Sequence, residues 1–158
     1  MDEAYTLARY LLRHQHDAQD VVQEAYLRAL RHYDPSTIGD ARAWLLTIVR
    51  HCCHSWQASH RADARSVEYD DDVHAHADSA PDPEMLTISR SVRDAVHAAL
   101  DALPPVYREI LILREIQQLS YREISQIVGI PMGTVMSRLA RARERLAGAL
   151  GGSSEAAG

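Results

Sequence analysis

The sequence predicts an all-α protein made of two small helical domains joined by a flexible acidic linker. Apolar residues recur with the period of amphipathic helices, about 3.6 residues, through most of the 158-residue chain. Residues 60–87 differ, because Asp, His, Ala and Ser dominate there and the apolar periodicity is lost. Such a composition cannot bury enough surface to order itself, so this segment is expected to be the linker.

The first domain is expected to cover residues 1–59. The apolar spacing predicts helices over residues 5–13, 17–32 and roughly 41–59. An Asp-Pro-Ser turn followed by Gly39 separates the second helix from the third. The positions expected to face the interior are Leu7, Ala8, Leu11, Leu12, Val21, Val22, Ala25, Ala29, Leu30, Leu45, Ile48, Val49, Cys52 and Trp56.

The second domain is expected to cover residues 88–150 as a four-helix, winged-helix-like unit. Its first two helices are predicted over residues 88–103 and 105–117, and a pair of prolines forces the turn between them. Residues 151–158 are expected to form a disordered tail. The expected interior positions of these two helices are Val92, Val96, Ala99, Leu103, Val106, Ile110, Leu113 and Ile116.

Residues 119–146 have the pattern of a helix-turn-helix, two helices joined by a tight turn. Ser120 is a good N-cap, and Glu123 three residues later completes a capping box. Gly129 follows the last apolar residue of the first helix, where a left-handed C-cap suits glycine. Pro131 lies at the start of the second helix, where a missing N–H has no cost. The residues expected to hold the two helices together are Ile124, Ile127, Val128, Val135, Leu139 and Leu146.

The other face of the second helix is basic and predicts double-stranded DNA as a partner. Arg138, Arg141 and Arg145 lie there with Ser137, and arginine forks can read guanine edges or clamp phosphates. Thr134 and the amide groups of the first turn suit a phosphate, because a helix N-terminus attracts anions. The alternative is an amphipathic surface helix with solvated arginines. The capping box, the glycine turn and the basic helix occur together, which favours DNA binding.

The net charge of −5, from 22 acidic and 17 basic residues, is unusual for a DNA-binding protein. Residues 57–90 contain eight acidic and three basic residues, so this segment accounts for the whole imbalance. The second helix of the motif, residues 131–148, carries a net charge of +3. Because local charge governs attraction to nucleic acid, the acidic total does not argue against DNA binding.

Several classes of protein and site are disfavoured by the sequence. No apolar run approaches about 18 residues and no signal peptide starts the chain, so a cytoplasmic protein without membrane insertion is expected. The run His51-Cys52-Cys53-His54 comes nearest to a metal site, but adjacent helical residues point apart, so no metal is expected. There is no nucleophile–base pair and no phosphate-binding glycine loop, so neither an enzyme nor a cofactor is expected.

Three segments resemble bacterial sigma factors of the sigma-70 family, extracytoplasmic-function (ECF) type. Residues 17–30, DAQDVVQEAYLRAL, resemble region 2.2, which binds the clamp helices of the RNA polymerase core. Residues 41–50, ARAWLLTIVR, resemble regions 2.3 and 2.4, which open and hold the −10 element. Residues 102–146, from ALPPVYREI to RARERL, resemble region 4, which binds the −35 element. The resemblance implies a factor that directs promoter-specific initiation of transcription.

The resemblance also implies site residues and partners. The residues implied to bind the clamp helices share one polar helix face and are Asp20, Gln23, Glu24 and Arg28. The residues implied at the −10 element are Trp44, Arg50 and His51. An aromatic ring there stacks on unpaired bases, with core packing of Trp44 as an equal alternative. The residues implied at the −35 element are Thr134, Ser137, Arg138, Arg141, Arg143 and Arg145. The implied partners are the RNA polymerase core, through its clamp helices and flap, promoter DNA and an anti-sigma factor.

Some positions depart from the family pattern. His51 stands where asparagine is usual and Ser55 where aspartate is common, which changes the hydrogen-bonding groups offered to −10 bases. Met136 stands where Arg or Lys is usual, so a charge is lost and apolar contact, for instance with a thymine methyl, becomes available. Family members also have about one further helix before the position of residue 5. The resemblance therefore implies either a member that is trimmed at its N-terminus or a start residue that is assigned too late.

Alternatives to a sigma factor stay open at this point. A helix-turn-helix regulator would bind DNA without polymerase, although the motif at residues 17–30 argues against it. A sigma-like protein that titrates a partner would bind polymerase or an anti-sigma factor without opening promoters. The acidic linker is either a solvated tether or, by resemblance, a segment that follows the RNA exit path of polymerase and mimics nucleic-acid charge.

Overall fold

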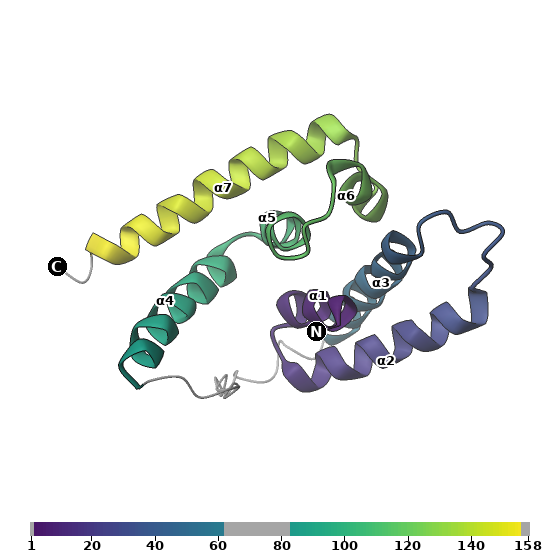
Figure 1. Ribbon diagram of the computed structural model, residues 1–158, viewed down its shortest axis with the longest axis horizontal. Coiled ribbons are helices and arrows are strands. Elements are labelled where there is room, and N and C mark those ends of the chain that lie inside the picture. The colour runs from purple at the N-terminus through teal and green to yellow at the C-terminus, as the bar shows by residue number, and fades with distance from the viewer. Residues whose placement is uncertain (1, 62–82, 156–158) are drawn as a thin grey trace.

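The chain is built from helices in residues 2–61 and 83–155, the part that the computed structural model describes (Figure 1). The first half comprises α1 (Glu3–Leu12), α2 (Gln15–His32) and α3 (Ala41–Arg61). The second half comprises α4 (Pro83–Ala102), α5 (Pro105–Leu111), the π-helical turn η1 (Ile112–Ile116), α6 (Tyr121–Val128) and α7 (Met132–Glu155). The all-α prediction is confirmed. These two ranges contain no strand, so the second half has no wing, and none of their helices is long and apolar enough to cross a lipid bilayer.

The helix boundaries follow the sequence pattern except beside the linker and at the C-terminus. α4 begins at Pro83, so residues 83–87, expected in the linker, are helical; a proline is well tolerated at a first helical position. α7 runs to Glu155, through the two glycines of the expected tail. Ala149 and Leu150, just before these glycines, are half-buried, and such packing extends a helix beyond the end that local propensity predicts. The rest of the expected linker and tail, residues 62–82 and 156–158, lies outside the described residues.

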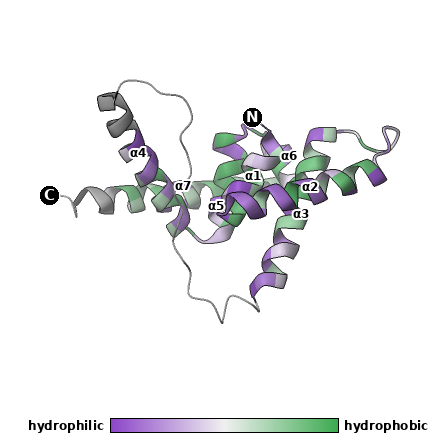
Figure 2. Ribbon diagram, turned by 90° about the horizontal axis from the view of Figure 1, so that it is seen from below, coloured by the Kyte–Doolittle hydropathy of each residue, from purple (hydrophilic) through white to green (hydrophobic). Residues whose placement is uncertain are grey.

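The two halves pack against each other and share one apolar core. α3 contacts α6, while α1 contacts α5 and η1, and these helices gather at the centre of the molecule (Figure 2). α2 and α7 lie on opposite outer sides of this group (Figure 1). Leu7 and Leu46 from the first half and Ile110 and Ile124 from the second are all at most 1% exposed. The helices expected in separate domains therefore bury apolar surface together.

Most positions expected to be interior are buried, but Leu30, Val92 and Val106 are not. Leu30 on α2 is 78% exposed, Val92 on α4 is 59% exposed and Val106 on α5 is 47% exposed. Val92 and Val106 lie in register with the buried residues of their helices, so the predicted face is right for these two. Leu30 directly follows the buried Ala29 and so lies about 100° away from it around α2, outside the buried face. An apolar period identifies a face of a helix but not how far along the helix a neighbour covers it.

The buried face of α3 is shifted relative to the prediction. Leu45, Ile48 and Trp56 are only half-buried, whereas the fully buried side chains of α3 are Ala43, Leu46, Val49, Cys52 and Cys53. α3 packs against α1 and α2 and also against α6. A helix with neighbours on several sides buries a wider arc than a single 3.6-residue stripe predicts (about 100°).

The π-helical turn changes the phase of the helix predicted over residues 105–117. In η1 the N–H of Gln117 donates to the carbonyl of Ile112, five residues back, at 3.0 Å. Such a turn rotates the following side chains relative to an α-helix. Ile116, expected inside, is therefore 41% exposed, whereas Leu119 is completely buried.

Candidate nucleic-acid interface

The helix-turn-helix forms as its sequence predicts. The hydroxyl of Ser120 accepts from the N–H of Glu123 at 3.1 Å, and the Glu123 carboxylate accepts from the N–H of Ser120 at 2.7 Å. Gly129 ends α6 with a φ of 75°, in the left-handed region that favours glycine. Val135 and Leu139 are at most 1% exposed and fix the rotation of α7 against the rest of the second half. The capping box, the turn and the buried stripe of α7 are thus confirmed.

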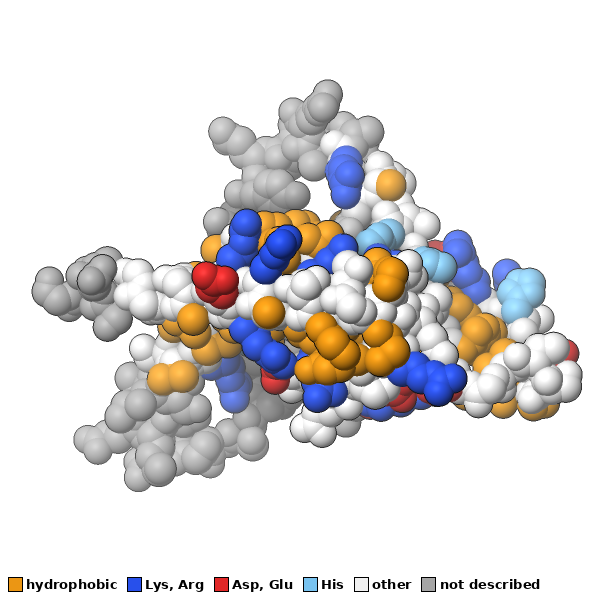
Figure 3. All heavy atoms as spheres, turned by 90° about the horizontal axis from the view of Figure 1, so that it is seen from above, with side chains coloured by type: hydrophobic (Ala, Val, Ile, Leu, Met, Phe, Trp, Pro, Cys, Tyr) orange, Lys and Arg blue, Asp and Glu red, His pale blue; other side chains and the backbone are white. Residues whose placement is uncertain are grey.

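The outer face of α7 carries two arginines with free charges. Ser137 and Arg141 are exposed, and Thr134 and Arg138 are half-buried at its edge. The Ser137 hydroxyl donates to the carbonyl of Thr134 at 3.2 Å. Within residues 2–61 and 83–155, Arg138 and Arg141 make no ion pair. Their guanidinium groups are available to an anionic partner, and basic side chains are visible along the face that carries α7 (Figure 3).

Arg143 and Arg145 are engaged within the protein. Arg143 donates to the Glu115 carboxylate from Nε at 2.9 Å and from a terminal nitrogen at 2.6 Å. This hydrogen bond raises the pKa of Arg143. The Arg145 guanidinium lies over the ring of Tyr107, 4.8 Å from its centre. The structure therefore holds these two predicted −35 residues against η1 and α5, apart from Arg138 and Arg141.

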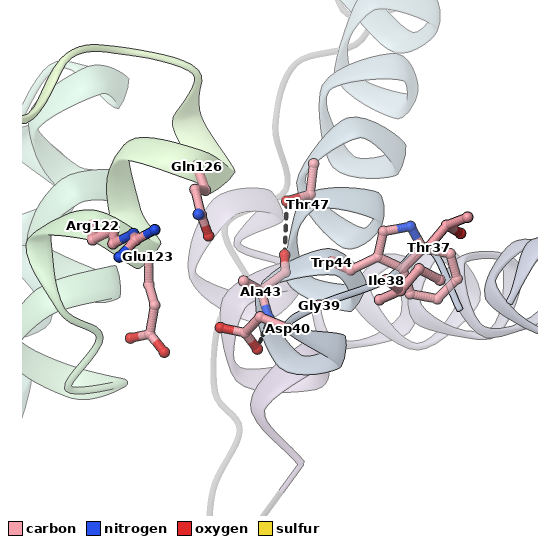
Figure 4. Close-up of a pocket in the computed structure, with 10 residues that line it drawn as sticks. All are labelled: Thr37, Ile38, Gly39, Asp40, Ala43, Trp44, Thr47, Arg122, Glu123 and Gln126. Carbon is pink, nitrogen blue, oxygen red and sulfur yellow. Dashed lines mark hydrogen bonds between the residues drawn. The ribbon is translucent and has the colours of Figure 1, made fainter. Parts of the chain in front are cut away.

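Trp44 on α3 lines a cleft between the two halves. It is half-buried, and its ring lies 5.8 Å from that of Tyr33 at an angle of 57°. The cleft has a volume of about 700 Å³ and is bounded by the segment before α3, by α3 itself and by α6 (Figure 4). Arg122 and Gln126 form its α6 wall, opposite Trp44. An aromatic side chain at the edge of an open cleft can hold a planar group.

Arg50 faces the second half and not the surface that carries His51. The Arg50 Nε donates to Oε1 of Glu109 on α5 at 2.5 Å, and His54 Nε2 lies 3.7 Å from the same oxygen. The side chains of Arg50 and Glu109 are only 16% and 5% exposed, whereas His51 is exposed. Burial alone would raise the pKa of Glu109, but the nearby His54, the hydrogen bond from Arg50 and the positive charge of both groups outweigh it and lower the pKa. The structure thus separates Arg50 from the other two predicted −10 residues.

A second arginine, Arg42, also joins the halves and was not singled out by the sequence. It donates to the Glu3 carboxylate from Nε at 2.7 Å, and a terminal nitrogen donates to the carbonyl of Gln117 at 2.7 Å. The Gln117 side chain in turn donates to the carbonyl of Glu3 at 2.6 Å. These partners are distant in sequence, so no local pattern predicts the contact.

Buried Arg108 on α5 holds the C-terminal end of α4. Its Nε donates to the carbonyl of Leu100 at 3.1 Å, and a terminal nitrogen donates to that of Leu103 at 3.0 Å. Burial lowers the pKa of Arg108. A guanidinium satisfies carbonyls that a helix C-terminus leaves unpaired.

α2 presents a mixed polar and apolar outer face. The predicted polymerase-binding residues are all exposed and are Asp20, Gln23, Glu24 and Arg28. Glu24 and Arg28 form an ion pair at 2.5 Å. Leu27, 48% exposed, and Leu30 accompany them on the surface of the same helix. This apolar component was not predicted from the sequence, although Leu27 within an otherwise polar helix face is a signal for it.

The His51-Cys52-Cys53-His54 run does not converge on a point. Cys52 and Cys53 are buried and free, whereas His51 and His54 are exposed. Burial raises the pKa of Cys53 to about 12, so this thiol is a poor source of thiolate. No group of three or more His, Cys, Asp and Glu side chains within residues 2–61 and 83–155 is arranged to hold a metal ion.

Known proteins match the chain over both halves. A family model of sigma-70 region 2 matches residues 1–63, and one of sigma-70 region 4 matches residues 93–146. The ECF RNA polymerase sigma factor SigE of Mycolicibacterium smegmatis is 34% identical over 145 residues, which are 92% of this chain and 56% of that protein. The ECF RNA polymerase sigma-E factor of Escherichia coli K12 is 34% identical over 138 residues, 82% of this chain and 72% of that protein.

A solved structure extends the likeness to three dimensions. The sigma factor RpoE of Bartonella quintana, crystallised with the anti-sigma factor NepR, is similar with a TM-score of 0.68 and 26% identity. The similarity covers 93% of this chain and 89% of that chain, so it includes both helical halves. The sequence matches, the fold and the helix-turn-helix agree, and the chain belongs to the ECF group of the sigma-70 family of RNA polymerase sigma factors.

Proposed function

We propose that this chain binds the RNA polymerase core through α2 and directs it to promoters, with α7 at the −35 element and α3 at the −10 element. The observation that carries the proposal is the helix-turn-helix, whose cap and buried residues hold α7 with Arg138 and Arg141 outward. A helix about 10–12 Å across fits a major groove about 12 Å wide. The first turn of α7 supplies amide groups and Thr134 for a backbone phosphate.

The outer face of α2 supports the polymerase contact. Exposed charges beside Leu27 and Leu30 give the combination of apolar centre and polar rim that protein interfaces have. On α3, Trp44 and its cleft offer a stacking surface for an unpaired base. Arg50 joins that contact only after it exchanges Glu109 for DNA.

The proposed partners are the polymerase core, promoter DNA and an anti-sigma factor. The last rests on the relative from Bartonella quintana, whose structure contains one. The chain acts on the specificity of polymerase and performs no chemistry of its own, and it works where polymerase is, in the cytoplasm.

Transcription of genomic DNA from the source organism by polymerase core, with and without the chain, tests the proposal. New start sites preceded by a shared pair of sequence elements are expected only when the chain is present. Duplex binding that polymerase does not affect would instead identify a helix-turn-helix regulator. Binding to core without new transcripts would identify a titrating protein.

A paired substitution locates the polymerase contact. Asp20→Ala with Glu24→Ala is expected to weaken binding to core and to leave affinity for −35 duplex unchanged. Asp94→Ala, an exposed acid on α4, is the matched control and should affect neither. Undiminished core affinity in the double variant would remove α2 as the docking helix.

A further inference from the structure

α7 exposes two long apolar side chains near its N-terminus. Met132 is 43% exposed and Met136 is 48% exposed. They lie four residues apart, which places them one above the other on the same face of the helix. Ala140, also exposed, continues the row by another four residues. We name Met132, Met136 and Ala140 the methionine stripe.

The methionine stripe borders the basic face of α7. At about 100° per residue, the helix circumference runs from the buried Val135 side to the stripe, then to Ser137 and Arg141, and finally to Arg138. Hydrophobic side chains lie between basic ones on the face of the molecule that carries α7 (Figure 3). A partner that meets this face therefore encounters an apolar strip and positive charges together.

We propose that the methionine stripe reads thymine methyl groups at the −35 element, an inference that rests on the proposed function. Arg138 and Arg141 make no ion pair within residues 2–61 and 83–155. A polyanion is therefore the partner expected on this face, next to the stripe. In the major groove the one apolar group that a base edge presents is the C5-methyl of thymine. A thioether cannot donate a hydrogen bond, so Met136 cannot make the contact to guanine that arginine makes.

The spacing of the stripe sets which thymines it reaches. Met132 and Met136 are separated by about 6 Å along the helix axis. This distance is close to two base-pair rises of about 3.4 Å. The preferred −35 sequence is therefore expected to carry thymines within about two base-pair steps of each other, next to the base or phosphate that Arg141 contacts.

Deoxyuridine substitution tests the inference directly. Selection from a random-sequence duplex pool, with the full chain bound to polymerase core, provides the preferred −35 duplex. Each thymine in it is then replaced by deoxyuridine, which removes one methyl and keeps every hydrogen-bonding group. At the contacted positions affinity is expected to fall about fourfold, the effect of burying one methyl.

Variants assign the effect to the stripe. Met136→Ala is expected to abolish the difference between thymine and deoxyuridine at the position that Met136 contacts and to keep it at the position that Met132 contacts, with affinity for the deoxyuridine duplex unchanged within about twofold. Val92→Ala removes an exposed apolar side chain of α4 and should keep the difference. Met136→Arg is expected to change the preferred base from thymine to guanine and to steepen the salt dependence.

The possible outcomes separate the inference from the proposed function. A selected duplex without thymine, or equal affinity of the unmodified chain for thymine and deoxyuridine duplexes, would overturn thymine reading and leave the proposed function standing. Selection that enriches no sequence at all would overturn the proposed function as well.

Discussion

Arg50 of α3 and Glu109 of α5 form an ion pair that connects the two halves of the protein, with 2.5 Å between Nε and Oε1. The pair is almost fully enclosed, since the two side chains are 16% and 5% exposed. Under the proposed function the guanidinium of Arg50 binds DNA at the −10 element. In this arrangement the same guanidinium is paired with the Glu109 carboxylate. Arg50 must leave Glu109 of the second half before it can bind DNA. Binding at the −10 element is therefore linked to separation of the two halves.

Glu109→Gln is expected to destabilise the folded chain by about 3 kcal/mol, because removal of one partner leaves the other charge buried without compensation. Urea denaturation measures the loss. Glu115→Gln breaks the Arg143 pair, whose side chains are 48% and 52% exposed, and should cost less than about 1 kcal/mol. Equal losses of unfolding free energy in the two variants would show that the enclosed Arg50 pair contributes no more stability than the exposed Arg143 pair.

The stability of the chain is expected to depend on Glu109 in acid. Its pKa in the folded state lies below the usual 4.5, because hydrogen bonds and positive charge outweigh burial. The ionised carboxylate therefore contributes its full stabilisation above pH 4.5, and the contribution disappears as the pH falls through the lower folded-state pKa. The difference in unfolding free energy between the native chain and Glu109→Gln should therefore shrink as the pH falls from 4.5 towards the folded-state pKa. A difference that stays constant down to pH 3 (roughly the lower end of usual carboxyl values) would contradict the assignment.

Ser120→Ala is expected to cost about 1 kcal/mol, because the N–H of Glu123 loses its capping partner. For a chain of this size the corresponding loss in melting temperature is about 2–4 °C. Ser91→Ala on the exposed surface of α4 is the matched control. Identical melting temperatures for the two variants would mean that the capping box contributes nothing to the fold.

Arg141→Ala is expected to weaken binding to the selected −35 duplex by about 1–3 kcal/mol if the side chain reads a base. Arg143→Ala should have a smaller effect, because Glu115 already neutralises that guanidinium. Titrations at several salt concentrations distinguish a phosphate contact, whose loss lowers the salt slope by about one, from a base contact. Unaltered affinity of Arg141→Ala would remove this residue from the interface.

The features that the sequence predicts well are those whose determinants lie close together in the chain. Ser120, Glu123 and Gly129 fall within ten positions, and each acts on its own backbone neighbourhood. The pair of Arg50 and Glu109 spans 59 positions, so nothing local indicates it. The assignment of contact residues to individual promoter elements stays a prediction.

Burial was predicted less well than helix formation, for two physical reasons. Leu30 is apolar, but it directly follows the buried Ala29 and so lies about 100° away from it around α2, which apolar character alone does not reveal. Ile116 is displaced by the π-helical turn of η1, a change in hydrogen-bond register that the side-chain pattern does not reveal. Apolar side chains exposed for such reasons, as at Leu27 and Leu30, are also the ones that a partner can cover.

Under the proposed function, the contact between α3 and α6 has a geometrical consequence for promoter binding. Sites at −10 and −35 lie roughly 25 base pairs apart, which is about 85 Å of duplex at about 3.4 Å per base pair. While α3 is in contact with α6, α3 and the neighbouring α7 cannot touch both ends of that span. The 21 residues between the described ranges have a contour length of at most about 70 Å, to which the dimensions of the two halves add. In this arrangement the chain is too compact to reach both elements. Under the proposed function, the two halves must therefore separate before the chain binds −10 and −35 together, and only the separated form selects the spacing between them.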